Sequence, residues 1–290
     1  MTIQAALLPD GRRLHLQHGP IDLVIEAWGE VGEVRAAYGQ AMTCFRTVLN
    51  HLVEELPLLR QPLGETPPAL TGSVARNMLA ACWPYRDSFI TPMAAVAGGV
   101  ADHVLAAMLT GRQLAKAYVN DGGDIALHLA ARESFDCGVV AHPAMPALLG
   151  KIHLVPGMGI GGIATSGAPT KGQGGRSFSF GIADAVTVLA RTAASADAAA
   201  TMIANAVDLS DHAGIRRVPA SSLDPDSDLG DRLVTLAVPR LATDDVARAL
   251  ADGARMAENF RQQGLISAAI LALQEKVEIC GADPLLRLAA

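Results

Sequence analysis

Hydrophobic and polar positions alternate at the start of the chain and then change to a helical spacing. Residues 3–8 and 12–17 alternate on either side of the turn signal at 9–11, which predicts a β-hairpin. Ile21–Glu26 has the pattern of a third strand. Between about Glu33 and Leu59 apolar residues recur every three or four positions, which predicts a long amphipathic helix.

Prolines divide the next segment into elements. Pro57 and Pro62 are expected to close the long helix, and four prolines within residues 61–70 predict an irregular connector. A second helix is expected from about Ser73 to Cys82. Thr91 followed by Pro92 has the form of an N-cap with proline at the first helical position, which predicts a third helix.

Two adjacent glycines, Gly98 and Gly99, lie inside the predicted third helix. A glycine in a helix interior costs about 1 kcal/mol relative to alanine. We therefore expect something to approach the helix backbone closely at this point, either a packed neighbour or a ligand.

Short strands and two helices follow in the second half of the chain. We expect strands at 118–120, 125–129, 136–141, 151–155, 185–190 and 232–238, a helix capped by Ser195 that runs to about Ala206, a helix at 243–263, and a final hairpin of 266–273 and 276–280. Strand pairs and helix runs are segregated rather than strictly alternating, which predicts an α+β fold with largely antiparallel sheets. We expect one domain of 290 residues, and an internal duplication at about 1–130 and 131–290 stays open.

Composition excludes several classes of function. Half of the 290 residues are apolar, 4% are aromatic and the formal net charge is -6, so a nucleic-acid partner is not expected. The four cysteines form no CxxC pair, which excludes a structural zinc knuckle. Charges such as Asp102 interrupt the apolar stretches, and the N-terminus lacks a basic start. We therefore expect a soluble, cytoplasmic protein without a membrane partner.

Glycines are concentrated between residues 157 and 175, where eight of the 28 lie. Gly157–Gly162 matches the letters of a dinucleotide fingerprint, but Pro156 precedes it and the β-like run Ile163–Thr165 follows it. The fingerprint requires a strand before and a helix after, so a Rossmann site is not expected. A segment this rich in glycine either adopts conformations closed to other residues or lets a ligand reach bare backbone.

Asp197 and Thr201 are four residues apart on a predicted helix with only alanines between them. This spacing stacks a carboxylate and a hydroxyl on one face, which suits Mg²⁺ completing its shell with water and phosphate. The alternative is an aspartate that favours the helix dipole and a threonine that bonds back to the preceding turn.

Three segments in this order resemble a known superfamily: PMAAVAGGVAD at 92–102, VNDGGDIALHL at 119–129, and the stretch 162–207 that begins GIATSG. They are similar to the ApbE superfamily of FAD-dependent flavin transferases. The whole chain more closely resembles the ApbE-like group named uncharacterised protein family 0280. The resemblance implies two decorated ββααββ units of the tunnel-fold type, whose members bind purines, pterins or flavins.

The resemblance also implies a site. Asp197 and Thr201 would be the side-chain ligands of Mg²⁺, with a main-chain carbonyl from about Val96 or Ala97. FAD or a related flavin or pterin would contact Gly98, Gly99, Asn120, Gly122, Gly123, Gly162, Thr165, Ser166, Gly167, Arg176 and Ser177. The candidate acid–base or ribose-contacting residues are Asp121, Asp124 and Asp184.

The chain also departs from the ApbE pattern. Residues 177–184 contain neither the histidine nor the DPRTG run of the transferases, and Ala97 replaces a lysine. We expect a protein of cofactor metabolism that binds a flat, phosphorylated small molecule, with flavin transfer left open. The alternatives are a pterin-binding enzyme of methanopterin-type one-carbon carrier biosynthesis and a non-catalytic flavin or nucleotide module. Tunnel folds usually assemble, so a homo-oligomer, with a homodimer first, is expected.

Overall fold

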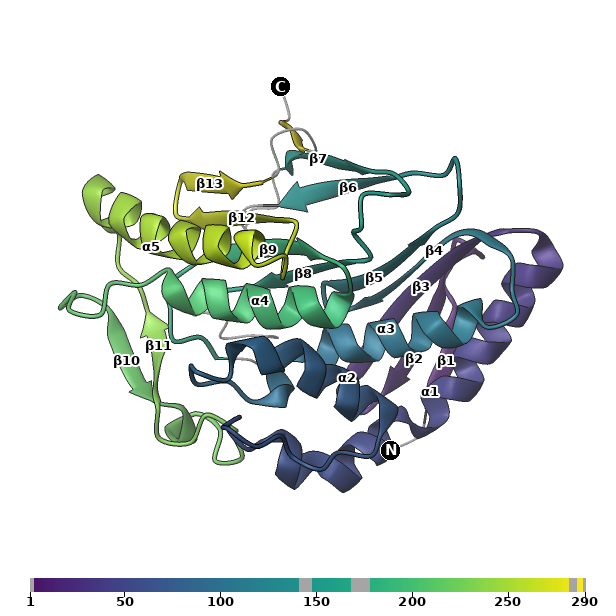
Figure 1. Cartoon of the computed structure of the whole chain (residues 1–290), viewed down its shortest axis with the longest axis horizontal. Helices are drawn as coiled ribbons and strands as arrows, with labels where there is room; N and C mark the ends of the chain where they lie inside the picture. The colour runs from purple at the N-terminus through teal and green to yellow at the C-terminus, as the bar shows by residue number, and fades with distance from the viewer. Residues whose placement is uncertain (1–2, 141–147, 168–177, 282–285, 289–290) are drawn as a thin grey trace. The chain divides into compact units, whose positions relative to one another are not determined.

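The computed structural model describes residues 3–140, 148–167, 178–281 and 286–288 of the chain, and Figure 1 labels its helices and strands. All ladders whose register is defined within these residues are antiparallel, so the predicted α+β class is confirmed. The chain divides into two compact units. Unit 1 comprises 1–135, 154–164 and 189–198, and unit 2 comprises 136–153, 165–188 and 199–290.

Unit 1 is built on an antiparallel ladder of consecutive strands. Its order is β1 (Gln4–Leu7), β2 (Leu14–His18), β3 (Ile21–Gly29), β4 (Leu114–Asp121), β5 (Asp124–Leu129) and β8 (Gly162–Ser166), the last of which continues into unit 2. Gly11, with φ +70°, makes the β1–β2 turn, as the sequence predicts. The β4–β5 turn has two glycines at positive φ, the geometry that tight two-residue hairpins require.

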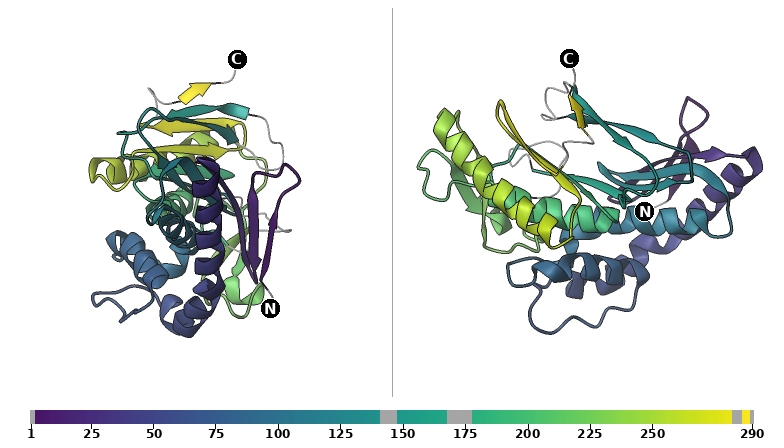
Figure 2. Two further views of the ribbon diagram at one scale, coloured as in Figure 1. Left: turned by 90° about the vertical axis from the view of Figure 1, so that its right-hand side faces the viewer. Right: turned by 45° about the horizontal axis from the view of Figure 1, so that its top comes forward.

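Three helices complete unit 1: α1 (Val31–Leu59), α2 (Ser73–Cys82) and α3 (Val96–Leu109). α1 packs on β2, β3 and α3, and Figures 1 and 2 show it running alongside the first strands. α3 packs on β4 and β5 with Val100, Val104 and Met108 fully buried. Among the described residues, one helical segment, Pro92–Leu109, is apolar and long enough to cross a membrane, and 50% of it is buried within the protein. A buried core helix meets the same criterion.

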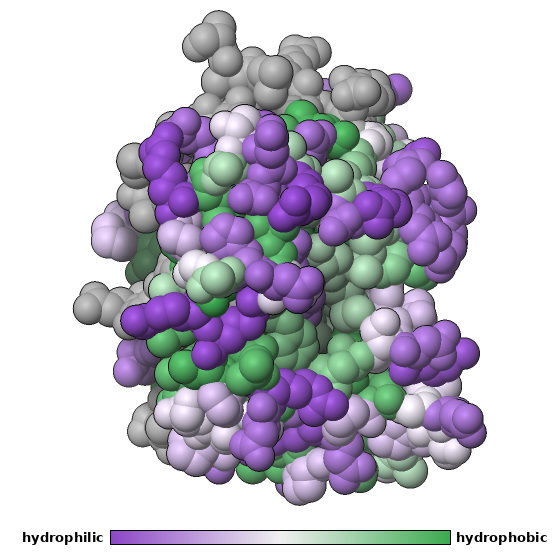
Figure 3. Space-filling model, turned by 90° about the vertical axis from the view of Figure 1, so that its left-hand side faces the viewer, coloured by the Kyte–Doolittle hydropathy of each residue, from purple (hydrophilic) through white to green (hydrophobic). Residues whose placement is uncertain are grey.

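Unit 2 contains a helix on a hairpin and two smaller sheets. α5 (Thr243–Gln262) packs on the hairpin of β12 (Ala268–Leu273) and β13 (Lys276–Cys280), and β12 is buried throughout. The smaller sheets are β6 (Phe135–Val140), β7 (Leu148–Leu154) and β14 (Leu286–Leu288), and β10 (Arg216–Pro219) with β11 (Leu233–Ala237). α5 and β10 lie on the left of Figure 1, and Figure 3 shows hydrophilic residues interspersed with hydrophobic ones on that side.

Some element boundaries differ from the sequence predictions. Pro57 does not close α1, which runs to Leu59, because a proline near the last turn removes a single backbone bond. α4 (Ala193–Ala206) begins two residues before Ser195, and the Thr192 hydroxyl caps it by accepting the Ser195 N–H at 3.1 Å. The segment from Pro92 to Ala95 is a 3₁₀ turn that precedes α3.

Two described strands have no counterpart in the sequence predictions. β10 is four residues long, contains two arginines and ends in proline, so it shows no hydrophobic alternation. β14 is three residues long, which is too short for a periodicity to appear. β9 (Ala185–Ala190), by contrast, lies where the sequence predicts it and is buried along its whole length.

Candidate functional site

Asp197 is the centre of the candidate site in unit 1. It lies on α4, and its Oδ2 accepts the backbone N–H of Gly98 at 3.1 Å, at the start of α3. Loss of hydration raises its pKa well above the usual aspartate value, and the nearby charges of Asp124 and then Asp121 raise the pKa further. Hydrogen bonds from the backbone of Gly98 and Ala97 act in the opposite direction. The environment therefore disfavours a negative charge on Asp197, in addition to those on Asp121 and Asp124, unless a cation or a proton accompanies it.

Two of the predicted aspartates flank the β4–β5 turn, and their charges act on the Asp197 carboxylate. Asp121 and Asp124 are cross-strand partners at the end of the hairpin, and Asp121 is buried. Gly122 and Gly123 form the turn with φ +63° and +116°, and a Cβ on either would meet no atom within 4 Å. The Asn120 side chain accepts the Gly123 N–H at 2.8 Å and so holds the turn in place. The turn thus presents bare backbone with open space beside it.

Three other predicted glycines face protein atoms. A Cβ on Gly98 would lie 2.3 Å from the carbonyl oxygen of Ala193, and one on Gly162 would lie 2.2 Å from the Ala193 nitrogen. Both therefore let backbone pack against the first turn of α4. Gly99 faces the Met78 side chain, 2.9 Å from where its Cβ would be. Of the two explanations that the sequence leaves open for the helix glycines, packing accounts for the space beside Gly98 and Gly99.

Asp102 holds the start of α4 and was not singled out by sequence reasoning. Its two carboxylate oxygens accept the backbone N–H groups of Ala193 at 3.0 Å and Ala194 at 2.9 Å. Burial raises its pKa, and these hydrogen bonds oppose the rise. The available signal was a carboxylate in the otherwise apolar helix of residues 96–109, a position that requires partners.

The remaining predicted residues belong to unit 2 or lie outside the described residues. Thr165 is exposed and its hydroxyl hydrogen-bonds that of Thr187 at 2.9 Å, and Ser166 is the last residue of β8. Gly167, at φ +119°, packs against the backbone of Ala183 and Ala185. Asp184 accepts the backbone N–H of Gln274, while its own N–H bonds to Ala272. Arg176 and Ser177 lie outside the described residues.

The predicted magnesium pair lies on α4. Asp197 and Thr201 are one helical turn apart, and the division between the two units falls between Ala198 and Ala199. Within the ranges that the structure describes, no three histidine, cysteine, aspartate or glutamate side chains are arranged to hold a metal ion. Mg²⁺ often takes only one or two protein carboxylates and keeps several waters, so Asp197 as a single carboxylate ligand fits such an ion. The role of Thr201 as second ligand stays a prediction.

The fold is antiparallel α+β, and a carboxylate of α4, Asp197, hydrogen-bonds the backbone at the start of α3. The chain belongs to the family described as AbpE bacteria, which it matches over residues 5–279. The resemblance drawn from the sequence is therefore confirmed.

Two archaeal proteins are similar to this chain in sequence. The chain is 33% identical to a UPF0280 protein of Methanosphaerula palustris over 184 residues, which are 63% of this chain and 70% of that protein. It is 37% identical to a UPF0280 protein of Methanospirillum hungatei over 148 residues, or 50% of this chain and 55% of that protein. The chain thus spans little more than half the length of the latter relative.

Two solved structures are similar in fold. One is a mutant of Flavin Transferase ApbE from Vibrio cholerae, with TM-score 0.49 and 12% identity over 98% of this chain and 99% of that one. The other is flavinyl transferase ApbE of Pseudomonas stutzeri in its apo form, with TM-score 0.47 and 12% identity over 100% and 98%. Both TM-scores lie below 0.5, and neither likeness identifies a function for this chain.

Proposed function

We propose that the protein binds a phosphorylated flavin of the FAD type together with Mg²⁺, in cofactor metabolism, at the site centred on Asp197. The observation that carries the proposal is geometric: the Asp197 carboxylate accepts the Gly98 N–H at 3.1 Å, and the Gly122–Gly123 turn, whose flanking aspartates act on Asp197 through their charge, has open backbone. Membership of an ApbE-like family supports the flavin as the ligand.

The electrostatics of the site support the cation. Three carboxylates in one neighbourhood repel one another, and this repulsion is part of what raises the pKa of Asp197. A divalent ion beside Asp197 removes that repulsion and neutralises phosphate oxygens of the ligand. The ligand would thus bring the negative charge that needs the ion, and the protein would bring the Asp197 carboxylate that holds it.

The chain's own residues supply binding and orientation. The Gly122–Gly123 backbone is open to the flat or phosphorylated part of the ligand, and Asn120 fixes the shape of that turn. Asp121 and Asp124 are the candidate residues for contacting a ribose hydroxyl or for moving a proton. The resemblance also predicts ligand contacts that stay predictions: Thr165, Ser166, Gly167, Arg176, Ser177 and Asp184. Transfer of a flavin to another protein stays open because the His and DPRTG motifs are missing.

A ligand panel tests this proposal. FAD, FMN, riboflavin and a neutral pterin are each titrated into the purified protein with Mg²⁺ present, and binding is followed by the visible or near-ultraviolet absorption of the ligand. We expect FAD to bind more tightly than riboflavin, because riboflavin lacks the phosphates that the cation neutralises. Preference for the pterin would support the one-carbon carrier alternative, and absence of binding by all four would refute the proposal.

Mass spectrometry of candidate acceptor proteins incubated with FAD separates the enzymatic from the non-catalytic alternative. Covalent addition of FMN would identify a transferase. Tight FAD binding without such addition would identify a binding module.

A further inference from the structure

A hollow separate from the site around Asp197 lies in unit 1, between the first three strands and α1. Its volume is about 550 Å³, within the range of about 300–1,000 Å³ typical of small-molecule sites. Its apolar lining comes from β1, β2, β3 and the first half of α1, and includes Leu7, Leu14, Trp28, Val31 and Met42. None of the residues proposed above for the flavin lines it.

Exposed hydrophobic side chains gather at this hollow. Leu7, Val31 and Met42 are 55%, 71% and 36% exposed, and they are half of the six large exposed hydrophobic residues in the described part of the chain. A concentration of exposed apolar area around a concave site marks a surface that a ligand can cover.

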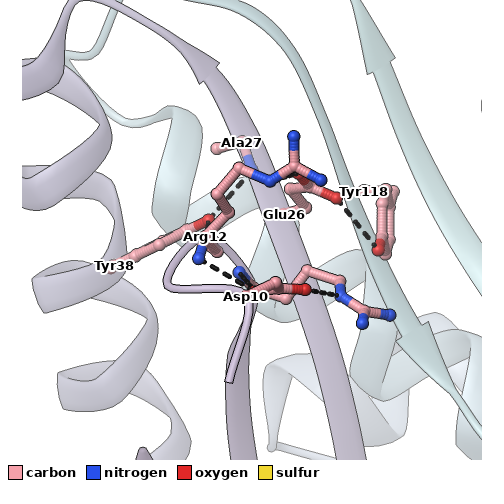
Figure 4. A network of polar contacts seen from close by, with 7 residues as sticks. Asp10, Arg12, Glu26, Ala27, Tyr38 and Tyr118 are labelled. Atoms are coloured by element: carbon pink, nitrogen blue, oxygen red, sulfur yellow. Dashed lines mark hydrogen bonds and ion pairs between the residues drawn. The ribbon is translucent and has the colours of Figure 1, made fainter. Parts of the chain in front are cut away.

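One carboxylate faces this apolar surface. Glu26 lines the hollow and is only 7% exposed. Its contacts are long: the Arg12 Nε lies 3.6 Å from one carboxylate oxygen, and the Tyr118 hydroxyl lies 3.5 Å from the other. Figure 4 draws Arg12 beside Glu26. The Arg12 side chain is itself 72% exposed, so the ion pair is largely solvated on one side. A closer cationic partner would therefore improve on contacts this long.

The walls around Glu26 are fixed by other contacts. The Tyr38 hydroxyl donates to the Arg12 carbonyl at 2.7 Å and accepts the Ala27 N–H at 3.2 Å (Figure 4). The Trp28 ring packs against the rings of Tyr118 and Phe135, with centroids 6.0 Å and 5.7 Å away. The hollow is therefore formed before any ligand arrives, which lowers the entropy cost of binding.

We propose that this hollow binds a small organic amine, a molecule with an apolar body and a protonated amino group. The apolar body covers Leu7, Val31 and Met42, and the amino group takes the place of the Arg12 guanidinium beside Glu26. Arg12 and Arg35 are both exposed at the hollow, where a charge contributes little because water screens it. The buried carboxylate therefore decides the sign of the preferred ligand, and an anionic ligand would bring a second negative charge beside Glu26.

Tryptophan fluorescence tests the proposal with three matched probes. Trp28 lines the hollow and Trp83 does not, so the Trp83→Phe variant leaves one reporter in place. We expect 2-phenylethylamine to change Trp28 emission and to bind at least about tenfold more tightly than 2-phenylethanol. Binding of 3-phenylpropanoate should be weaker than that of the alcohol. An acid that binds more tightly than the amine would overturn the proposal in favour of recognition by the arginines.

Variants in the same background locate the contact. Glu26→Gln should remove the preference for the amine, whereas Glu54→Gln, an exposed glutamate of α1 outside the hollow, should leave it unchanged. Arg12→Ala, an exposed position, should tighten amine binding because the competing cation is gone. A loss of binding in Arg12→Ala, or an unchanged preference in folded Glu26→Gln, would each overturn the proposal. So would a dimer that covers Trp28 and makes it insensitive to all three probes.

Discussion

At the scale of single residues, the absence of side-chain atoms determines how α3 and α4 pack. The main-chain oxygen of Ala193 occupies the space that a Cβ on Gly98 would need. The sequence indicates that something approaches this helix glycine, because the energetic cost of glycine there needs a reason. It cannot indicate which atom approaches, since the partner lies 95 positions further along the chain.

Replacing Gly98 by alanine should destabilise the protein. The new methyl group would meet backbone atoms that no rotamer change can move, and overpacking of this kind costs about 1–3 kcal/mol. Gly39→Ala is the matched control, because Gly39 lies inside α1 with no atom within 4 Å of its Cβ position. It should raise the free energy of unfolding by up to about 1 kcal/mol. Urea unfolding measures both, and a Gly98→Ala protein as stable as the wild type would contradict this account of the packing.

The same scale explains which site residues the sequence could indicate. Asp121, Asp124 and Asp197 belong to segments with a recognisable pattern, and they do share one electrostatic neighbourhood. Asp102 is the single carboxylate of α3 and Glu26 is one of two in β3, and their roles depend on partners far away in sequence. Such residues can be flagged as anomalies from the pattern, but their partners come from the fold alone.

At the scale of elements, hydrophobic periodicity predicts most helices and strands because each buries one face. It fails where an element is too short or too polar to have a face, as at β10, and where proline is tolerated near a helix end, as at Pro57. Contacts between elements also use polar side chains that periodicity does not detect. Glu55 of α1 accepts the N–H groups of Thr71 at 2.6 Å and Gly72 at 3.0 Å, just before α2 begins.

The contribution of Glu55 should depend on pH in a defined direction. Its hydrogen bonds, led by the one from the Thr71 backbone, hold its pKa below the usual glutamate value. A lowered folded-state pKa adds stability above the unfolded-state pKa, and this stability is lost as the pH falls through the folded-state pKa. Glu55→Gln should therefore be less stable than the wild type at pH 7, and the difference should shrink below about pH 4.3.

Urea unfolding at several pH values checks this prediction. The neighbouring Glu54→Gln is the control, because Glu54 is exposed. A destabilisation by Glu55→Gln that is equal at pH 3 and pH 7 would indicate that the carboxylate charge is not what joins α1 to α2.

At the scale of the whole molecule, the two compact units share elements of the same chain. β8, β9 and α4 each begin in one unit and end in the other. Neither unit therefore has a complete set of elements without the other. The expected single domain and the possible internal duplication stay predictions, because compactness alone does not show that a unit folds independently.

Unfolding should consequently be a single cooperative transition. Both tryptophans, Trp28 and Trp83, belong to unit 1, so tryptophan fluorescence reports on that unit, whereas far-ultraviolet circular dichroism reports on both. We expect the two signals to give the same urea midpoint within error. A fluorescence midpoint clearly separated from the circular dichroism midpoint would show that the units unfold one at a time.

The central claim is that Asp197 holds a divalent cation for a phosphorylated flavin. Isothermal titration calorimetry of FAD, with Mg²⁺ and then with EDTA, tests it in the wild type, in Asp197→Asn and in the control Asp244→Asn, an exposed aspartate in the first turn of α5. The account predicts FAD binding that depends on Mg²⁺, weakens more than about tenfold in Asp197→Asn and is unchanged in Asp244→Asn. FAD binding that is equal with and without Mg²⁺, and equal in Asp197→Asn, would contradict it.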